Sequence, residues 1–150
     1  NLGIVGKYLN TPDTYLSIIR AVECAGIELG VKVTIHWLNP EDIVKNEYDM
    51  DQLKQYDGFI VPGGFGSRGI QGKLKVTEYC RIEKIPILGI CLGMQIMVVD
   101  CYNSLGGKKG TSTEWIDDKT YVPVIDILPN QTGKRDKRQN KRNDSGIGKD

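Results

Sequence analysis

One cysteine of the chain stands in a context that suits covalent chemistry. Cys91 is the centre of the run Gly89-Ile90-Cys91-Leu92-Gly93, which follows an apolar stretch typical of a strand and precedes a stretch typical of a helix. This is the arrangement of a nucleophile elbow, with cysteine in place of serine. Such a turn holds its nucleophile in a strained backbone conformation, and small neighbours prevent clashes. Amides at the start of the helix favour a thiolate and can stabilise the oxyanion formed when it attacks a carbonyl.

A second glycine-rich run, Pro62-Gly63-Gly64-Phe65-Gly66, follows the predicted strand before it. Glycines let backbone N–H groups approach a ligand closely, so the Gly64 N–H could complete an oxyanion hole. Taken alone, the run is equally compatible with a plain tight turn or a phosphate-binding loop. Because ligands bind beyond the carboxyl ends of parallel strands, we expect this run and the elbow to lie together there.

The remaining thiols and the histidine carry weaker signals. Cys24, Cys80 and Cys101 occur singly, without a CxxC pair, which argues against a zinc ribbon or a thioredoxin-like site. We interpret these three as small buried residues, and free thiols as typical of a reducing cytoplasm. The single histidine, His36, lies inside a predicted strand and is interpreted as structural. By itself Glu114 would be a solvated loop carboxylate, and no metal site is expected.

The elements that must position these residues alternate along the chain. Apolar or β-branched runs predict strands, and helical periodicity with helix-start residues predicts helices. The predicted strands are 2–6, 31–38, 57–62, 85–90 and 122–128, and the predicted helices are 12–30, 70–83 and 92–102, with one or two short helices in 39–56. Thr11 is a candidate N-cap. This order is typical of an α/β fold with a mostly parallel sheet, in which the unbroken apolar run 85–90 would be buried on both faces.

The bulk composition is that of one ordinary globular domain, with a distinct end. There is no apolar run of membrane-spanning length and no signal peptide is expected, so no membrane partner is predicted. Residues 132–150 hold seven Lys/Arg against three Asp/Glu and show no periodicity. We expect them to be a disordered insert or tail. Nucleic-acid or anionic-lipid binding is the alternative, disfavoured because no aromatic residues are interleaved.

Several motifs together resemble the class I glutamine amidotransferase domain of the CTP synthase family. Both glycine-rich runs carry the resemblance, the second one extended by Met94-Gln95. Other similar segments are Gly6-Lys7-Tyr8, Pro12-Asp13 with Tyr15 and Ser17, Ser67-Arg68-Gly69, Ser112-Thr113-Glu114 and Pro123-Val124-Ile125-Asp126. The resemblance covers residues 1–131 and implies a flavodoxin-like three-layer α/β sandwich.

The resemblance also implies an activity. Cys91 would attack the side-chain amide of L-glutamine and form a γ-glutamyl thioester, releasing ammonia and then glutamate. Gly64 and Leu92 would donate the oxyanion-hole N–H groups. The residues implied to bind glutamine are Gly64, Leu92, Gly93, Met94, Gln95 and Glu114, the last at the α-amino group. In the family, ammonia passes to a synthetase domain that uses ATP and Mg²⁺ to aminate UTP to CTP, GTP is the allosteric activator, and the enzyme is a cytoplasmic homo-oligomer, expected to be a tetramer.

The chain departs from the family pattern in one important respect. The family completes its site with a His and a Glu downstream of the cysteine, whereas here no histidine follows Cys91. The family arginine for the glutamine carboxylate is missing too. We therefore expect residues 1–131 to be a partial amidotransferase domain that alone lacks efficient glutaminase activity. Two alternatives stay open: a non-catalytic domain that binds glutamine or a partner, and another cysteine hydrolase of this fold, γ-glutamyl hydrolase-like or DJ-1-like.

Overall fold

The computed structural model describes residues 1–9, 11–45, 50–64, 66–106, 108–115 and 120–128. Within these residues the central sheet has four parallel strands in the order β2-β1-β3-β4. The strands are β1 (Leu2–Val5), β2 (Ile35–Leu38), β3 (Gly58–Val61) and β4 (Ile87–Gly89). The basic segment 132–150, expected to be a disordered insert or tail, lies outside the described residues.

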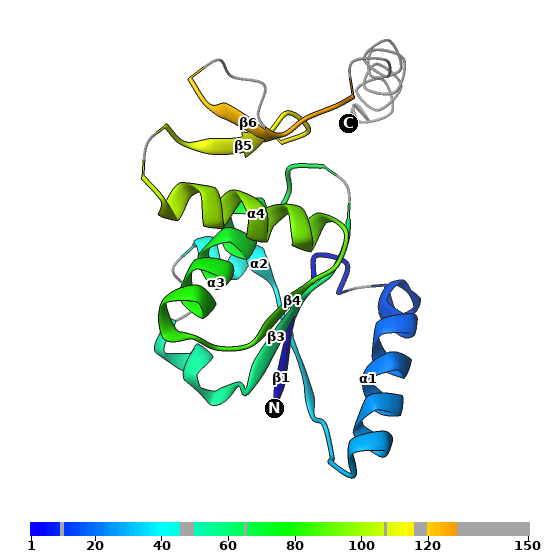
Figure 1. The fold of residues 1–150 in the computed structure, drawn as a ribbon. Helices are drawn as coiled ribbons and strands as arrows, with labels where there is room; N and C mark the ends of the chain where they lie inside the picture. The colour runs from blue at the N-terminus through cyan, green and yellow to red at the C-terminus, as the bar shows by residue number, and fades with distance from the viewer. Residues whose placement is uncertain (10, 46–49, 65, 107, 116–119, 129–150) are drawn as a thin grey trace.

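Helices cover the two faces of this sheet in three layers (Figure 1). On one side lies α1 (Leu16–Leu29), preceded by the 3-10 helix η1 (Pro12–Tyr15). The other side carries α2 (Pro40–Val44), α3 (Ile70–Glu83) and α4 (Leu92–Ser104), while the 3-10 helix η2 (Met50–Gln55) precedes β3. A separate parallel pair, β5 (Gly110–Ser112) and β6 (Val122–Ile125), lies against α4. The predicted fold class is confirmed.

The main core fills the space between the sheet and the α3–α4 side. Its strand residues include Val5, Phe59 and Val61, each no more than 2% exposed. Helices α3 and α4 complete it with Val76 and Ile96, both fully buried. Close approach of the helices depends on glycines. A Cβ on Gly72 of α3 would overlap the backbone carbonyl of Pro40 at the start of α2, so only glycine fits there.

Most element boundaries were predicted to within a few residues, and the helix 70–83 agrees fully. The predicted strand 31–38 is shorter, because Val31 takes part in ending α1. Gly30 adopts a φ of +66°, and the Val31 N–H donates to the Gly26 carbonyl at 2.9 Å. Such a left-handed turn is a common helix C-cap. One or two short helices in 39–56 were expected, and α2 and η2 confirm them.

Three details of the elements differ from the sequence-based expectation. Thr11 stands at the N-cap position of η1, as predicted, but its side chain makes no capping hydrogen bond within the described residues. The Thr14 N–H closes this turn by donating to the Thr11 carbonyl at 3.1 Å. Strand β5 was missed, because three residues give no periodicity. The run 85–90 is not buried on both faces: Leu88 is 56% exposed, and β4 is an edge strand of the described sheet. In the described residues, no helix is long and apolar enough to cross a membrane.

Candidate active site

Cys91 occupies the sharp turn between β4 and α4. Its φ of +54° and ψ of −108° lie outside the regions that residues with a side chain normally adopt. Among the described non-glycine residues only Lys84 also has a positive φ. Such a conformation costs about 1–3 kcal/mol and persists only where the surroundings enforce it. The strained elbow expected from the sequence is therefore present, and its thiol side chain is exposed to solvent.

The glycines on either side of the elbow are required by backbone contacts. A Cβ on Gly89 would lie 2.5 Å from the Gly93 carbonyl carbon, and a Cβ on Gly93 would overlap the Val61 carbonyl oxygen. The first turn of α4 thus rests directly on the end of β3. This contact brings the start of the helix, with its outward-directed amides, to the carboxyl edge of the sheet.

Backbone hydrogen bonds fix the elbow further. The Ile90 N–H donates to the Val61 carbonyl at 2.9 Å, and the Gly93 N–H donates to the Ile90 carbonyl at 2.9 Å. The Gln95 N–H donates to the Cys91 carbonyl at 3.2 Å. None of these three bonds uses the N–H of Leu92, the residue predicted to be an oxyanion donor. This amide follows the thiol directly in the chain.

The second glycine-rich run lies beside the elbow, as expected. Strands β3 and β4 pair in parallel with Val61 opposite Gly89, so the loops that follow them are neighbours. A Cβ on Gly63 would lie 3.3 Å from the Cys91 Cβ and 3.8 Å from its Sγ. Gly64 has a φ of +150°, a value that favours glycine. Phe65 lies outside the described residues.

On its far side this loop meets the segment after β1. A Cβ on Gly64 would lie 2.9 Å from the Lys7 Cε and 3.4 Å from the Tyr8 ring. Lys7 is only 6% exposed, and its Nζ lies 5.3 Å from the centre of the Tyr8 ring. The loop therefore runs between the nucleophile and a buried lysine.

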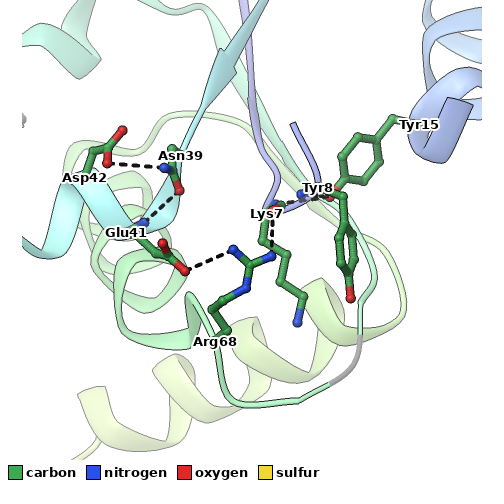
Figure 2. A network of polar contacts seen from close by, with 7 residues as sticks. All are labelled: Lys7, Tyr8, Tyr15, Asn39, Glu41, Asp42 and Arg68. Carbon is green, nitrogen blue, oxygen red and sulfur yellow. Dashed lines mark hydrogen bonds and ion pairs between the residues drawn. The ribbon is translucent and has the colours of Figure 1, made fainter. Parts of the chain in front are cut away.

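A network of polar contacts ties the same loop to β1 and α2 (Figure 2). Arg68 donates from Nη2 to the Lys7 carbonyl at 2.9 Å and from Nη1 to Glu41 Oε1 at 3.1 Å. The buried Tyr15 hydroxyl accepts the N–H groups of Lys7 and Tyr8 at 3.1 and 3.3 Å. The segments quoted for the resemblance, Gly6-Lys7-Tyr8 and Ser67-Arg68-Gly69, thus meet in space. Sequence reasoning assigned them no place in the site.

Sequence reasoning also missed Lys73 on α3. This side chain is fully buried, and its Nζ donates to the Pro62 carbonyl at 3.1 Å. Burial, and to a smaller extent the charge of Lys7, lowers the pKa of Lys73 to about 8. A lysine within a helix is ordinarily solvent-exposed, so the burial of Lys73 could not be predicted from its residue type.

The residues predicted to bind glutamine have mixed surroundings. Met94 is 51% exposed at the start of α4, whereas the Gln95 Oε1 is buried and has no hydrogen-bond partner within the described residues. Glu114 follows β5 and is exposed, and its backbone N–H donates to the buried Ser112 Oγ at 3.2 Å. Because β5 packs against α4, Glu114 belongs to the layer that covers this helix.

The other cysteines divide into two kinds. Cys80 on α3 is 1% exposed, and burial, with a smaller effect of Asp100, raises the pKa of its thiol to about 12. The prediction of a buried thiol is confirmed there. It is wrong for Cys24 and Cys101, which are exposed. Both lie on helix faces directed to solvent. This exposure cannot be predicted from cysteine being a small apolar residue.

The histidine is remote from the elbow, as predicted. Its Nε2 lies 3.2 Å from Asn1 Oδ1, and the His36 ring packs at 5.3 Å from the Tyr56 ring. Strands β1 and β3 separate its strand, β2, from β4. Among the described residues, no group of three or more His, Cys, Asp or Glu side chains is placed to hold a metal ion.

The profile of the family described as "Glutamine amidotransferase class-I" matches residues 10–147. The chain belongs to this family.

Within this family, the chain is similar to CTP synthases. The chain is 47% identical over 132 residues to CTP synthase of Methanosarcina barkeri, and 42% identical over 130 residues to CTP synthase of Bacillus subtilis. These matches cover 88% and 87% of this chain but only 25% and 24% of those enzymes, so the chain spans about a quarter of their length. The solved glutaminase domain of Trypanosoma brucei CTPS with bound acivicin is similar with a TM-score of 0.75 and 32% identity, covering 89% of this chain and 52% of that one.

Proposed function

We propose that the chain forms the nucleophile-bearing part of the glutaminase domain of a CTP synthase. The observation that carries this proposal is the strained Cys91, with a φ of +54°, beside the Gly63-Gly64 loop. Membership of the amidotransferase family and the names of the relatives support the choice of glutamine as substrate.

The reaction assigned to the site has two stages. The Cys91 Sγ forms a bond to the side-chain carbonyl carbon of glutamine, and the carbonyl oxygen becomes an oxyanion that the N–H groups of Gly64 and Leu92 stabilise. The carbon–nitrogen bond then breaks, and the nitrogen takes up a proton and leaves as ammonia. Water attacks the thioester carbon, the carbon–sulfur bond breaks, and glutamate leaves with the thiol restored.

Substrate binding is assigned to the start of α4 and to β5. The buried Gln95 Oε1 lacks a hydrogen-bond partner within the described residues, and a buried polar atom of this kind is costly unless a ligand satisfies it. Gly93 and Met94 would line the same end of the helix. Glu114 is the carboxylate assigned to the α-amino group, since a charge-assisted hydrogen bond suits that pair.

Proton transfer is the part of the reaction for which the described residues place no histidine at the elbow. The elbow needs a general base, and the single histidine, His36, is held on β2 beside Asn1. We therefore infer that the 150-residue chain alone is not an efficient glutaminase. In the family pattern, a histidine downstream of the cysteine supplies this base.

The remaining assignments concern the whole enzyme. Ammonia would serve the amination of UTP to CTP in a synthetase domain, where ATP and Mg²⁺ supply the activation of UTP. The described residues of this chain gather no metal-binding group, and no step here is assigned to the ion. GTP as an allosteric activator and assembly as a homo-oligomeric tetramer are carried over in the same way. Four free cysteines, each in a described segment, support a reducing cytoplasmic location.

Covalent labelling tests this function. The chain is incubated with acivicin, the ligand of the similar Trypanosoma brucei domain, and the adduct is located by peptide mass mapping. We expect one adduct on Cys91, slowed by L-glutamine but not by D-glutamine. Cys91→Ala should remove the adduct. Cys101→Ser is the matched control, because it removes an exposed thiol on the same helix and should leave labelling unchanged.

Other outcomes would contradict the proposal. Labelling spread equally over Cys24, Cys91 and Cys101, or no protection by L-glutamine, would mean that no glutamine site surrounds the thiol. Reaction of Cys91 with iodoacetamide but not with acivicin would favour another class of cysteine hydrolase. Ammonia release above that of Cys91→Ala would show that the chain itself supplies a base.

A further inference from the structure

The carbonyl group that begins the oxyanion loop is held by an unusual partner. Pro62 follows β3 directly and is fully buried, and its carbonyl oxygen accepts a hydrogen bond of 3.1 Å from the Lys73 ammonium on α3. Lysine is almost never fully buried unless it is paired with an opposite charge. Among the described residues, no carboxylate lies within ion-pair distance of this ammonium, and its hydrogen-bond acceptor is the Pro62 carbonyl.

That carbonyl belongs to the peptide group next to the nucleophile. The peptide bond is planar, so fixing the Pro62 oxygen also fixes the direction of the Gly63 N–H on the other side of the same plane. A Cβ on Gly63 would lie 3.3 Å from the Cys91 Cβ. The next residue, Gly64, has a φ of +150°. Two successive glycines have wide conformational freedom, so the direction of their N–H groups depends on an external anchor.

Burying the Lys73 ammonium costs free energy, which a functional role would explain. The ammonium loses its hydration in the core, and the positive charge of Lys7 on the other side of the loop adds repulsion, which together lower the pKa of Lys73 to about 8. A methionine or leucine would fill the same space without these costs. What the lysine adds is a strong, directed hydrogen bond to one backbone oxygen.

We propose that Lys73 is a positioning residue for the glutaminase reaction, whose buried ammonium anchors the Pro62–Gly63 peptide group and so fixes the start of the loop that presents the Gly64 N–H to the oxyanion formed on Cys91. This inference rests on the proposed function. It deepens that function by assigning the orientation of the oxyanion loop to a side chain on α3, a helix that carries none of the reacting groups.

The test compares two reactions of the same thiol in the full 150-residue chain. The γ-(4-nitrophenyl) ester of L-glutamate acylates Cys91: a carbon–sulfur bond forms, the carbon–oxygen bond breaks, and 4-nitrophenolate leaves with the electron pair. This reaction passes through an oxyanion but needs no proton donor, so a missing histidine does not prevent it. Iodoacetamide alkylates the same sulfur by direct displacement of iodide, and no oxyanion forms.

We expect Lys73→Met to slow acylation at saturating ester roughly 10- to 100-fold, as misdirecting an oxyanion donor does. The half-saturating ester concentration and the iodoacetamide rate should change by less than about twofold, because neither depends on the oxyanion. Lys75→Met is the matched control, since it removes the same charge two residues along α3 and should change neither rate.

Three outcomes would contradict the inference. Equal loss of acylation and alkylation in Lys73→Met would assign the residue a purely structural role and overturn the inference. Unchanged acylation would overturn it as well, while leaving the proposed function intact. If the wild-type chain is acylated no faster than Cys91→Ala, the proposed function fails and the inference with it. Circular dichroism verifies folding, and Lys73→Leu replaces Lys73→Met in the same comparison if the latter does not fold.

Discussion

The two faces of the parallel sheet are covered by helices of equal length but very different burial. Helices α1 and α3 each have 14 residues, all of them described. In α3 six residues are buried, including a lysine, whereas α1 buries only Gly26. Ile27 of α1 is 82% exposed, while Val76 of α3 is fully buried. Apolar residues recur at helical spacing along α1, and yet α3 buries more of its residues.

The glycine contacts of the two faces differ in the same direction. On the site-bearing face, Gly72 and Gly93 let helices touch the backbone of another element, at Pro40 and at Val61. On the other face, a Cβ on Gly26 would lie 2.9 Å from the Val31 carbonyl, which belongs to the loop that ends the same helix. Backbone-to-backbone contact between elements therefore occurs where the elbow and its neighbouring loop must be held. Rigid support of this kind is what a preorganised site needs.

The largest effect is expected where α4 touches β3. Gly93→Ala places a Cβ on the Val61 carbonyl, which is backbone and cannot move aside, so we expect a loss of about 4 kcal/mol or more of unfolding free energy. Gly30→Ala on the α1 face meets open space and suffers only from its φ of +66°, at about 1 kcal/mol. Urea unfolding of both variants measures the two losses of unfolding free energy. Equal losses would contradict the expected difference between the two faces.

A smaller contrast is expected between two isoleucines. Ile96 of α4 is fully buried, so Ile96→Ala should cost about 3 kcal/mol through lost burial and the cavity left behind. Ile27→Ala on α1 should stay within about 0.5 kcal/mol, because 82% of that residue is already exposed. Thermal and urea unfolding give both values. A costly Ile27→Ala would mean that the α1 face is covered in solution.

The buried lysine gives the site-bearing face a pH dependence. Below pH 8 Lys73 is protonated in the folded and unfolded chain, and its burial cost is fully present. Between its folded pKa of about 8 and the ordinary value of 10.5, only the unfolded chain keeps the proton, so stability rises with pH by up to about 3 kcal/mol. Urea unfolding from pH 7 to pH 9 should show the first part of this rise. Above pH 9 the unfolded chain loses the Cys80 proton that the folded chain keeps, because burial raises the pKa of this thiol to about 12, and this opposes the rise. Persistence of the rise in Lys73→Met would assign it to another group.

The mildest probe of the two faces is thiol modification of the native chain. Near pH 8.5 iodoacetamide should modify Cys24 on α1 while leaving Cys80 on α3 unmodified, since burial raises the pKa of the Cys80 thiol to about 12. Peptide mass mapping reads each site, and in urea all four cysteines should react. If native Cys80 were modified at the rate of Cys24, the thiol on α3 would be as accessible to the reagent as the exposed thiol on α1.

Features that depend on neighbours along the chain could be predicted from the amino-acid sequence. The elbow was predicted because Gly89, Cys91 and Gly93 stand at fixed spacing between an apolar strand and a helix. The bounds of α3 were predicted because the glycine-rich loop that ends at Gly69 precedes it and the apolar run 85–90 follows it. The order of strands and helices, and with it the parallel sheet, follows from the same local signals.

Which surfaces contact one another became visible only in the folded chain. Leu88 and Cys24 have apolar side chains and were expected inside, but each points away from the described core. Lys73 was given no role, yet it is buried against the Pro62 carbonyl. The physical reason is common to all three: burial is a property of two contacting surfaces, whereas residue type and periodicity describe only one of them.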